Sequence, residues 1–193
     1  IIEFYFNMDE LKKIANAIGE RLYAGTPGAL EEAVDLYQKR IYNLAYRFTC
    51  DREEAFDLSQ EIFLRLHSRA KLFCCGTDFN AWFMRLAVNT AINYRAKTLR
   101  NPGRNALELC DEINPCITGE PDHLEKEAIN YGINALLAQL PKKERMAIIF
   151  QTWEKKKVKE IADLMNTSVK SVEGLLTRAR KRLKKILKKN EGF

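Results

Sequence analysis

Long apolar runs are missing from this chain of 193 residues. No stretch approaches the roughly 20 consecutive apolar residues that a membrane-spanning helix needs, so we expect no membrane insertion. The first residues, IIEFYFNMDELKK, have neither a basic start nor a small-residue cleavage site, which argues against a secretory signal peptide. These absences predict a cytoplasmic protein.

Paired metal ligands are also missing, although the chain has five cysteines. Cys74 and Cys75 are adjacent, and Cys110 and Cys116 are separated by five residues, so neither pair has the C-x2-C spacing of a zinc site. We therefore expect reduced thiols, no structural metal and no cofactor. A redox role for the thiols stays open as the alternative.

Strand signals are almost absent as well, since no hairpin dipeptide separates alternating apolar runs. Helical periodicity dominates and predicts an all-α fold. The expected helices cover 8–23, 28–48, 52–69, 78–99, 124–139, 142–153, 158–165 and 168–189. The stretch 101–122 contains Pro102, Pro115, Pro121 and two glycines, and we interpret it as a linker between two helical domains.

The charge is spread unevenly over these parts. Residues 1–100 carry 14 Lys and Arg against 13 Asp and Glu, residues 101–125 carry 1 against 6, and residues 126–193 carry 17 against 7. The first part is therefore nearly neutral, the connector acidic and the last part strongly basic. A basic domain favours polyanions, with nucleic acid as the first expectation and an anionic membrane as the second.

The basic part contains the pattern of a helix-turn-helix, VKEIADLMNTSVKSVEGLL. Asn166 and Thr167 interrupt the helical period, Thr167 or Ser168 is placed to cap the next helix, and the small Ala162 allows a close helix crossing. A solvated basic helix without a ligand is the plain alternative. A membrane-surface helix is disfavoured, because the apolar face has no Trp or Phe.

The second helix of this motif has two different faces at about 100° per residue. Val169, Val172, Leu176, Ala179 and Leu183 share the apolar face. The opposite face is short, polar or basic, as a recognition helix in a major groove requires. Gly174 on that face either permits close approach to DNA or is a tolerated surface glycine. The candidate DNA-binding residues here are Lys170, Ser171, Gly174, Thr177, Arg178, Lys181 and Lys185.

The segment TCDREEAFDLSQEIFLRL begins with a capping-box pattern, Asp51 and Glu54. Ala55, Leu58, Ile62 and Leu66 form the expected buried stripe. The other side carries two carboxylates, an amide and an exposed leucine, which suit a surface that binds a partner helix. This candidate surface consists of Asp57, Gln60, Glu61 and Leu64. Acid–base catalysis by the carboxylates is disfavoured, because no His, metal ligand or nucleophile completes a site.

A further helix, DFNAWFMRLAVNTAINYRAKTLR, carries Arg85, Asn89, Asn93 and Lys97 at steps of four. Asparagine is a mediocre helix former, so this column suggests contacts with bases and phosphates, against the alternative of a merely solvated face. The preceding loop, KLFCCGTDF, places Gly76 among aromatic residues and could hold an unstacked base.

Three segments in this order resemble a bacterial RNA polymerase sigma factor of the extracytoplasmic-function type, in the sigma-70 family. They are DREEAFDLSQEIFLRL, FNAWFMRLAVNTAINYRAK, and the run from LPKKERMAIIF to RARKRLKK. The resemblance covers roughly residues 28–100 and 124–189. It implies two helical domains without catalytic activity and promoter-specific transcription initiation by binding core RNA polymerase.

The resemblance also implies roles for particular residues. Asp57, Leu58, Gln60, Glu61 and Phe63 match a motif that docks on the clamp helices of the polymerase β′ subunit. The loop and helix after it correspond to the part that melts and reads the −10 element, and the helix-turn-helix corresponds to the −35 reader, whose domain also meets the β flap. The residues that we assign to the −10 element are Lys71, Asp78, Phe79, Asn80, Arg85, Asn89, Asn93 and Lys97.

The resemblance implies a sigma-2-like domain in residues 1–100, an acidic linker in 101–123 and a sigma-4-like domain in 124–193. It also implies an anti-sigma factor or another recruiting protein as a partner. Glu173 and Leu175 stand where many relatives have a basic pair, so the −35 sequence does not carry over. Two alternatives stay open at this point: a sigma-like regulatory decoy and a stand-alone helix-turn-helix regulator.

Overall fold

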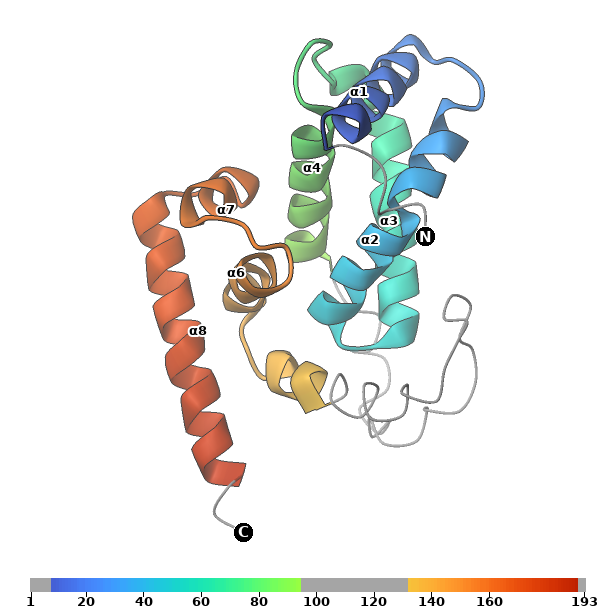
Figure 1. Ribbon diagram of the computed structural model, residues 1–193. Helices are drawn as coiled ribbons and strands as arrows, with labels where there is room; N and C mark the ends of the chain where they lie inside the picture. The colour runs from blue at the N-terminus through green and yellow to red at the C-terminus, as the bar shows by residue number, and fades with distance from the viewer. Residues whose placement is uncertain (1–7, 95–131, 191–193) are drawn as a thin grey trace.

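The computed structural model describes residues 8–94 and 132–190, and every regular element in these two ranges is helical (Figure 1). The expectation of an all-α fold is confirmed for these residues. None of the helices in them is long and apolar enough to span a membrane. In chain order, the helices are α1 (Met8–Ala24), α2 (Ala29–Thr49), α3 (Arg52–Arg69), the 3-10 helix η2 (Ala70–Leu72), α4 (Phe79–Asn93), an unlabelled helix over 132–138, α6 (Lys142–Thr152), α7 (Val158–Leu164) and α8 (Val169–Asn190).

The first group of helices, α1 to α4, packs around an apolar core in which α2 and α3 share the most extensive contact. The predicted stripe on α3 is confirmed, since its four apolar residues are fully buried. Asp51 caps α3 by accepting a hydrogen bond of 2.8 Å from the backbone N–H of Glu54, as the sequence pattern predicts. A cap of this kind contributes about 1 kcal/mol to stability. The stripe and the cap together fix which side of α3 faces outward.

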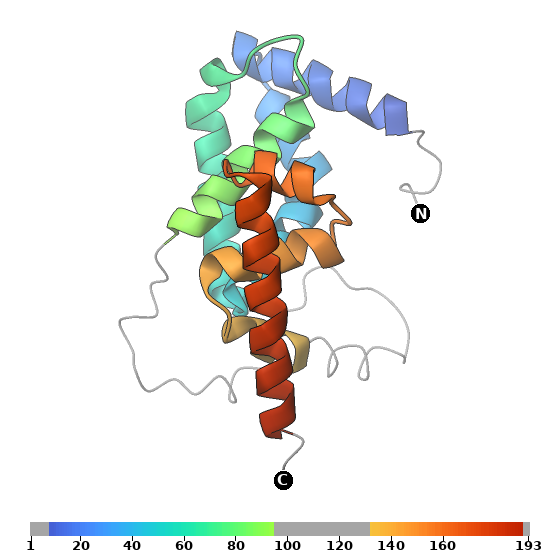
Figure 2. The same cartoon turned by 90° about the vertical axis from the view of Figure 1, so that its left-hand side faces the viewer.

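The second group runs from 132 to the end of α8. α6 lies at its centre and contacts both α7 and α8. Buried apolar residues from these helices join the first core in one continuous cluster. α8 begins against α7 and extends beyond the other helices, so its C-terminal half projects from the body in both views (Figures 1 and 2).

The two groups are packed against each other, with α6 contacting α2 and α4, and α7 contacting α4. The Arg145 side chain donates hydrogen bonds to the carbonyl oxygens of Phe48, Ala138 and Leu140, and so joins three segments. The guanidinium of Arg47 lies 5.2 Å from the ring centroid of Trp153. This interface combines polar contacts with a shared apolar core.

One predicted helix ends earlier than its sequence pattern indicates. The pattern continues to residue 99, whereas α4 ends at Asn93 and Tyr94 is extended, with φ −61° and ψ 130°. The Tyr94 side chain packs against the core and its backbone carbonyl accepts a hydrogen bond from Lys142, which lies in the second group. Tertiary contacts therefore override the helical periodicity at this point. Lys97 and the linker lie outside the described residues.

Candidate functional sites

The outward side of α3 presents the predicted partner surface. Gln60 and Leu64 are exposed, with Leu64 65% accessible, and Asp57 and Glu61 are partly exposed. Glu61 forms an ion pair of 2.7 Å with Arg65, one turn further along. The structure therefore brings the four predicted residues together on one face, where two carboxylates surround accessible apolar surface.

This surface also contains a residue that the sequence reasoning missed. Phe56 is 56% exposed, an unusual position for a phenylalanine in a helix whose opposite side is fully buried. Phe56, Gln60 and Leu64 follow one another at steps of four, so they form one stripe. The sequence contained a signal for Phe56, because the four-residue spacing of Phe56, Gln60 and Leu64 is the same as the spacing of Asp57 and Glu61. We name Phe56, Asp57, Gln60, Glu61 and Leu64 the α3 face.

The segment before α4, residues 70–78, is anchored by aromatic packing. Phe73 and Phe79 are buried and their ring centroids lie 5.3 Å apart, while Trp82 covers Phe73 at 5.5 Å. Because Phe79 is fully buried, its ring is a core element in this arrangement and is not available for stacking on a base. Between the two phenylalanines the chain is exposed, from Cys74 to Thr77.

Lys71 and Leu72 stand at the outer edge of the same segment. Leu72 is 70% exposed, the highest value among the exposed large apolar side chains of the described residues, and was not singled out from the sequence. Lys71 is exposed, and its Nζ donates a hydrogen bond of 2.6 Å to the backbone carbonyl of Tyr23. Short 3-10 helices give no strong periodic signal, which explains why Leu72 could not be recognised earlier.

The predicted column on α4 lies on the exposed side of that helix. Arg85, Asn89 and Asn93 are all exposed, whereas Ala87 and Val88 between them are buried. Three of the four residues in this column are therefore free to meet a ligand, and the fourth, Lys97, lies outside the described residues.

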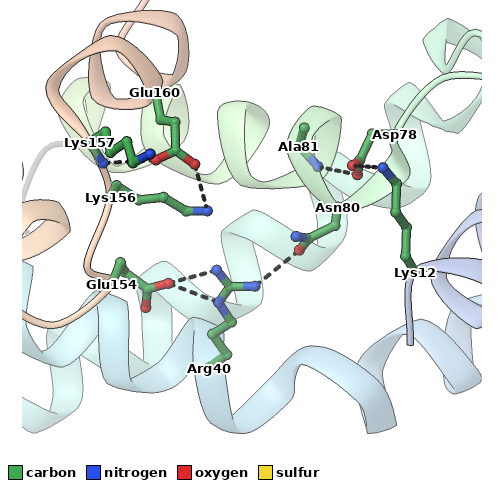
Figure 3. A network of polar contacts seen from close by, with 9 residues as sticks. All are labelled: Lys12, Arg40, Asp78, Asn80, Ala81, Glu154, Lys156, Lys157 and Glu160. Atoms are coloured by element: carbon green, nitrogen blue, oxygen red, sulfur yellow. Dashed lines mark hydrogen bonds and ion pairs between the residues drawn. The ribbon is translucent and has the colours of Figure 1, made fainter. Parts of the chain in front are cut away.

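Asp78 and Asn80 have structural partners at the beginning of α4 (Figure 3). Asp78 is the N-cap of the helix and accepts a hydrogen bond of 3.0 Å from the backbone N–H of Ala81. Burial tends to raise the pKa of the Asp78 carboxyl, but hydrogen bonds from the Ala81 backbone and from Lys12 outweigh it and hold the pKa below its usual value. Asn80 accepts a hydrogen bond of 3.0 Å from Arg40. These two residues therefore do not share the exposed column.

The helix-turn-helix predicted from the sequence is present in α7 and α8. The turn places Asn166 in the left-handed region, at φ 49°, and the backbone N–H of Thr167 donates a 2.9 Å hydrogen bond to the carbonyl of Ala162. Ser168 accepts a hydrogen bond of 3.2 Å from the Ser171 N–H and is thus the cap of α8. Ala162 is buried, which agrees with the close crossing that its small side chain predicts.

The two faces of α8 are separated nearly as predicted. Val172, Leu176 and Ala179 are buried against α6 and α7, and Leu175 joins them, whereas Val169 at the start of the helix is 42% exposed. On the other side the predicted DNA-binding residues other than Gly174 are exposed, and Gly174 is partly buried. The exposed set is Lys170, Ser171, Thr177, Arg178, Lys181 and Lys185.

Arg178 is held by two features that the sequence did not reveal. Its Nε lies 3.3 Å from the carboxylate of Glu144, a buried residue of α6 whose other oxygen lies 3.0 Å from Arg182. A Cβ built on Gly174 would lie 3.2 Å from Nη1 of Arg178, so the guanidinium passes over the glycine. Gly174 therefore makes room for Arg178 within the protein, an interpretation that neither alternative from the sequence included.

Among the described residues, the thiols of Cys50, Cys74 and Cys75 are free, and no cluster of three His, Cys, Asp or Glu is arranged to hold a metal ion. Cys110 and Cys116 lie outside the described residues.

Comparison with known proteins gives these surfaces a family context. The sequence model of Sigma-70 region 2 matches residues 33–101, and that of Sigma-70 region 4 matches residues 132–183. The chain belongs to the sigma-70 family. The first match contains the α3 face and α4, and the second contains α6, α7 and most of α8.

Individual proteins agree with this assignment. The ECF RNA polymerase sigma factor SigW of Bacillus subtilis is 26% identical over 171 residues, which are 85% of this chain and 91% of SigW. CnrH, in a complex with the cytosolic domain of CnrY, superposes with a TM-score of 0.61 at 20% identity, over 90% of this chain and 96% of CnrH. The sigma factor RpoE of Bartonella quintana, in a complex with the anti-sigma factor NepR, superposes with a TM-score of 0.57 at 19% identity. The match covers 83% of this chain and 98% of RpoE.

The two solved structures have the fold that the sequence predicted, an all-α chain with a sigma domain 2 bundle and a sigma domain 4 helix-turn-helix. The chain is an extracytoplasmic-function sigma factor, and its function is promoter-directed transcription initiation with RNA polymerase. This family is not an enzyme class. The predicted family and function are therefore confirmed.

Proposed function

We propose that this sigma factor acts through three surfaces on its two helical groups. The α3 face binds core RNA polymerase, the 70–78 segment with the exposed column of α4 opens and reads the −10 element, and the outward face of α8 reads the −35 element. The observation that carries the proposal is the helix-turn-helix. The burial of Val172, Leu176 and Ala179 on the back of α8 leaves Lys170, Ser171 and Thr177 facing outward.

For the α3 face we propose the clamp helices of the polymerase β′ subunit as the partner. Its carboxylates, Asp57 and Glu61, suit a basic partner helix, and exposed Phe56 and Leu64 supply apolar area beside them. Complementary charges at such an interface speed association and set its register, while apolar residues at the centre supply affinity. The β flap is the proposed partner of the second helical group.

For the −10 element we propose the exposed residues Lys71, Arg85, Asn89 and Asn93, with Lys97 as a further candidate outside the described residues. Amides can form hydrogen bonds with base edges, and cations can bind phosphates. Recognition of melted promoter DNA requires both kinds of contact. Asp78 serves this site as a helix cap and Phe79 as its buried anchor, so both support the segment without a direct base contact.

For the −35 element we propose that the N-terminal half of α8 enters the major groove. Residues near the beginning of a recognition helix usually reach the bases, which assigns base contacts to Lys170, Ser171, Thr177 and Arg178. Lys181 and Lys185 follow on the exposed side further along the helix and hold phosphates. Gly174 supports this surface by accommodating the guanidinium of Arg178.

Reading both elements at once requires the two helical groups to separate. The −10 and −35 elements are about 25 base pairs apart, which is roughly 85 Å along B-form DNA at 3.4 Å per step. In the packed arrangement α7 contacts α4 directly, so the helix-turn-helix lies against the helix that we propose for the −10 element. Arg40 donates hydrogen bonds to both Asn80 and Glu154 in this state (Figure 3), and its contact with Glu154 is lost when the groups part.

The domain boundaries and the cellular setting are part of the proposal. We assign a polymerase-binding and −10 domain to residues 1–100, an acidic linker to 101–123, and a −35 domain to 124–193. By analogy with RpoE bound to NepR, we propose that an anti-sigma factor or another recruiting protein binds this chain. We further propose that the chain acts in the cytoplasm and has no catalytic activity of its own.

Run-off transcription with purified core polymerase tests the proposal. A promoter is first selected from a library randomised at both elements, and we expect transcripts only when core, chain and promoter are all present. A matched control is the same chain with Thr177 and Arg178 both replaced by alanine, which should keep core binding and lose −35 preference. Core binding without promoter-dependent transcripts would indicate a decoy, and sequence-specific binding to DNA without core would indicate a stand-alone regulator.

A further inference from the structure

Helix α1 precedes the segment that matches the Sigma-70 region 2 model, which begins at residue 33. It nevertheless packs on α4 and on η2, the two elements that border the exposed loop before α4. In Figure 1, α1 lies across the end of the bundle at which this loop is found. α1 therefore contacts the 70–78 segment from outside the part of the chain that defines the family.

The contacts fasten both ends of the segment. At its beginning, Lys71 donates to the carbonyl of Tyr23 at 2.6 Å, and its Nζ lies 5.5 Å from the ring centroid of the same tyrosine. At its end, Lys12 pairs with Asp78 at 3.2 Å (Figure 3). The exposed residues 74–77 are thus suspended between two attachments to one helix.

A third polar attachment is made by Asn16. Its Oδ1 accepts a hydrogen bond of 3.0 Å from the backbone N–H of Phe79, the first residue of α4. Such an N–H has no partner within its own helix and needs an acceptor from elsewhere. Asp78 serves the N–H of Ala81, so Asn16 supplies the additional acceptor from a different helix. α1 therefore fixes the position at which α4 begins.

Gly19 allows the rings of Phe79 and Phe73 to pack closely against α1. A Cβ built at Gly19 would lie 2.4 Å from Cδ2 of Phe79 and 2.9 Å from Cε1 of Phe73, both closer than van der Waals contact allows. A glycine in a helix interior is destabilising by about 1 kcal/mol relative to alanine, so its presence here has a packing reason. The two rings that carry the segment pack directly on the backbone of α1.

We propose that α1 is a positioning element for strand opening, and that Asn16 and Gly19 are positioning residues that hold the 70–78 segment in the conformation that captures a base of the −10 element. The inference rests on the proposed role of this segment at the −10 element. Neither residue contacts DNA; both act through Phe79 and Phe73. Lys12 contributes less, since an ion pair as exposed as Lys12 with Asp78 is weak.

The test compares duplex with pre-opened templates, using the full chain and core polymerase. The test variants are Asn16→Ala and Gly19→Ala. The rescue variant is Asn16→Asp, which keeps a hydrogen-bond acceptor. The control is Lys13→Ala, on the exposed side of α1. We expect Asn16→Ala to lower open-complex formation on the duplex by about fivefold to tenfold, the scale of one lost hydrogen bond. On a promoter with an unpaired −10 region, the same variant should reach at least half of the wild-type rate.

Three further readouts separate positioning from general damage. Core affinity and −35 binding should stay at wild-type values in Asn16→Ala, and Asn16→Asp should restore duplex opening. If Gly19→Ala does not fold, Asn16→Ala and its rescue by Asn16→Asp still decide the matter. Equal losses on both templates, or no loss on the duplex, would overturn the inference. Wild-type chain that opens no promoter with core would instead overturn the proposed function, so the two failures are distinguishable.

Discussion

Arg40 on α2 and Glu154 after α6 are 114 residues apart in the sequence, yet the guanidinium donates two hydrogen bonds to one carboxylate oxygen, at 3.1 and 2.6 Å. The same guanidinium donates to Asn80 on α4 (Figure 3). Both charged side chains are largely shielded from solvent, with 33% and 17% of their surface accessible. This pair therefore joins the two helical groups, and it is one of the polar contacts that must break when they separate.

Replacing Glu154 with arginine should open the packed arrangement. The new charge would face Arg40 and leave it without its acceptor, and loss of a charged hydrogen bond of this kind costs about 1.5–3 kcal/mol. Small-angle X-ray scattering of the free chain should show a larger radius of gyration at an unchanged helix content by circular dichroism. Glu31→Arg is the matched control, because Glu31 is exposed on the same helix as Arg40. An unchanged scattering profile for Glu154→Arg would show that the pair does not hold the groups together.

Reversing both charges of the α3 face, with Asp57→Arg and Glu61→Arg, should abolish transcription by weakening core binding while the fold persists. The loss should amount to several kcal/mol if both carboxylates are desolvated in the complex. The control is Glu31→Arg with Asp35→Arg, which makes the same double reversal one turn apart on the exposed side of α2. Affinity for core is measured by fluorescence titration. Wild-type affinity in the α3 variant would remove this face from the polymerase interface.

The sequence predicts features that depend on near neighbours. The Asp51 cap, the buried stripe of α3 and the turn at Asn166 each require only a few consecutive residues, and each is present. Contacts between distant residues could not be foreseen in this way. Three features depend on which helices become neighbours. They are the close packing of Phe79 on Gly19, the ion pair of Arg178 with Glu144, and the end of α4 at Asn93. Phe79, which the resemblance assigned to the −10 element, is fully buried in this arrangement.

The described thiols should differ in reactivity. Burial raises the pKa of the Cys50 thiol, with a smaller opposing effect from Arg145, so less thiolate is present at pH 8 than for an ordinary cysteine. Cys74 and Cys75 are exposed in the loop before α4. Brief treatment with iodoacetamide, followed by peptide mass spectrometry, should label Cys74 and Cys75 well before Cys50. Promoter DNA with core polymerase should protect the loop pair, and unprotected labelling would argue against a −10 role for this loop.

The two halves of α8 should respond differently to alanine substitution. Replacing Thr177 or Arg178 should change which −35 sequences are preferred, by roughly 1–3 kcal/mol for each lost base contact. Replacing Lys185, which lies two turns further along the exposed side, should weaken all sequences alike and reduce the salt slope by about one unit. Promoter libraries and salt titrations measure both effects. If Arg178→Ala weakens every sequence equally, Arg178 holds a phosphate and the base contact assigned to it is wrong.

Gly174→Ala should have opposite effects on stability and on DNA binding. Alanine is favoured over glycine in a helix interior by about 1 kcal/mol, so α8 gains stability. The added Cβ would lie 3.2 Å from Nη1 of Arg178, so the guanidinium must shift slightly beside Glu144, and we expect the preference for the −35 sequence to fall. Thermal unfolding and binding to labelled promoter DNA measure the two quantities in one preparation. Glu173→Ala is the control, because it places an alanine at the neighbouring exposed position of α8, which is not among the proposed DNA-binding residues. A rise in stability without any loss of sequence preference would show that the position of Arg178 does not depend on Gly174.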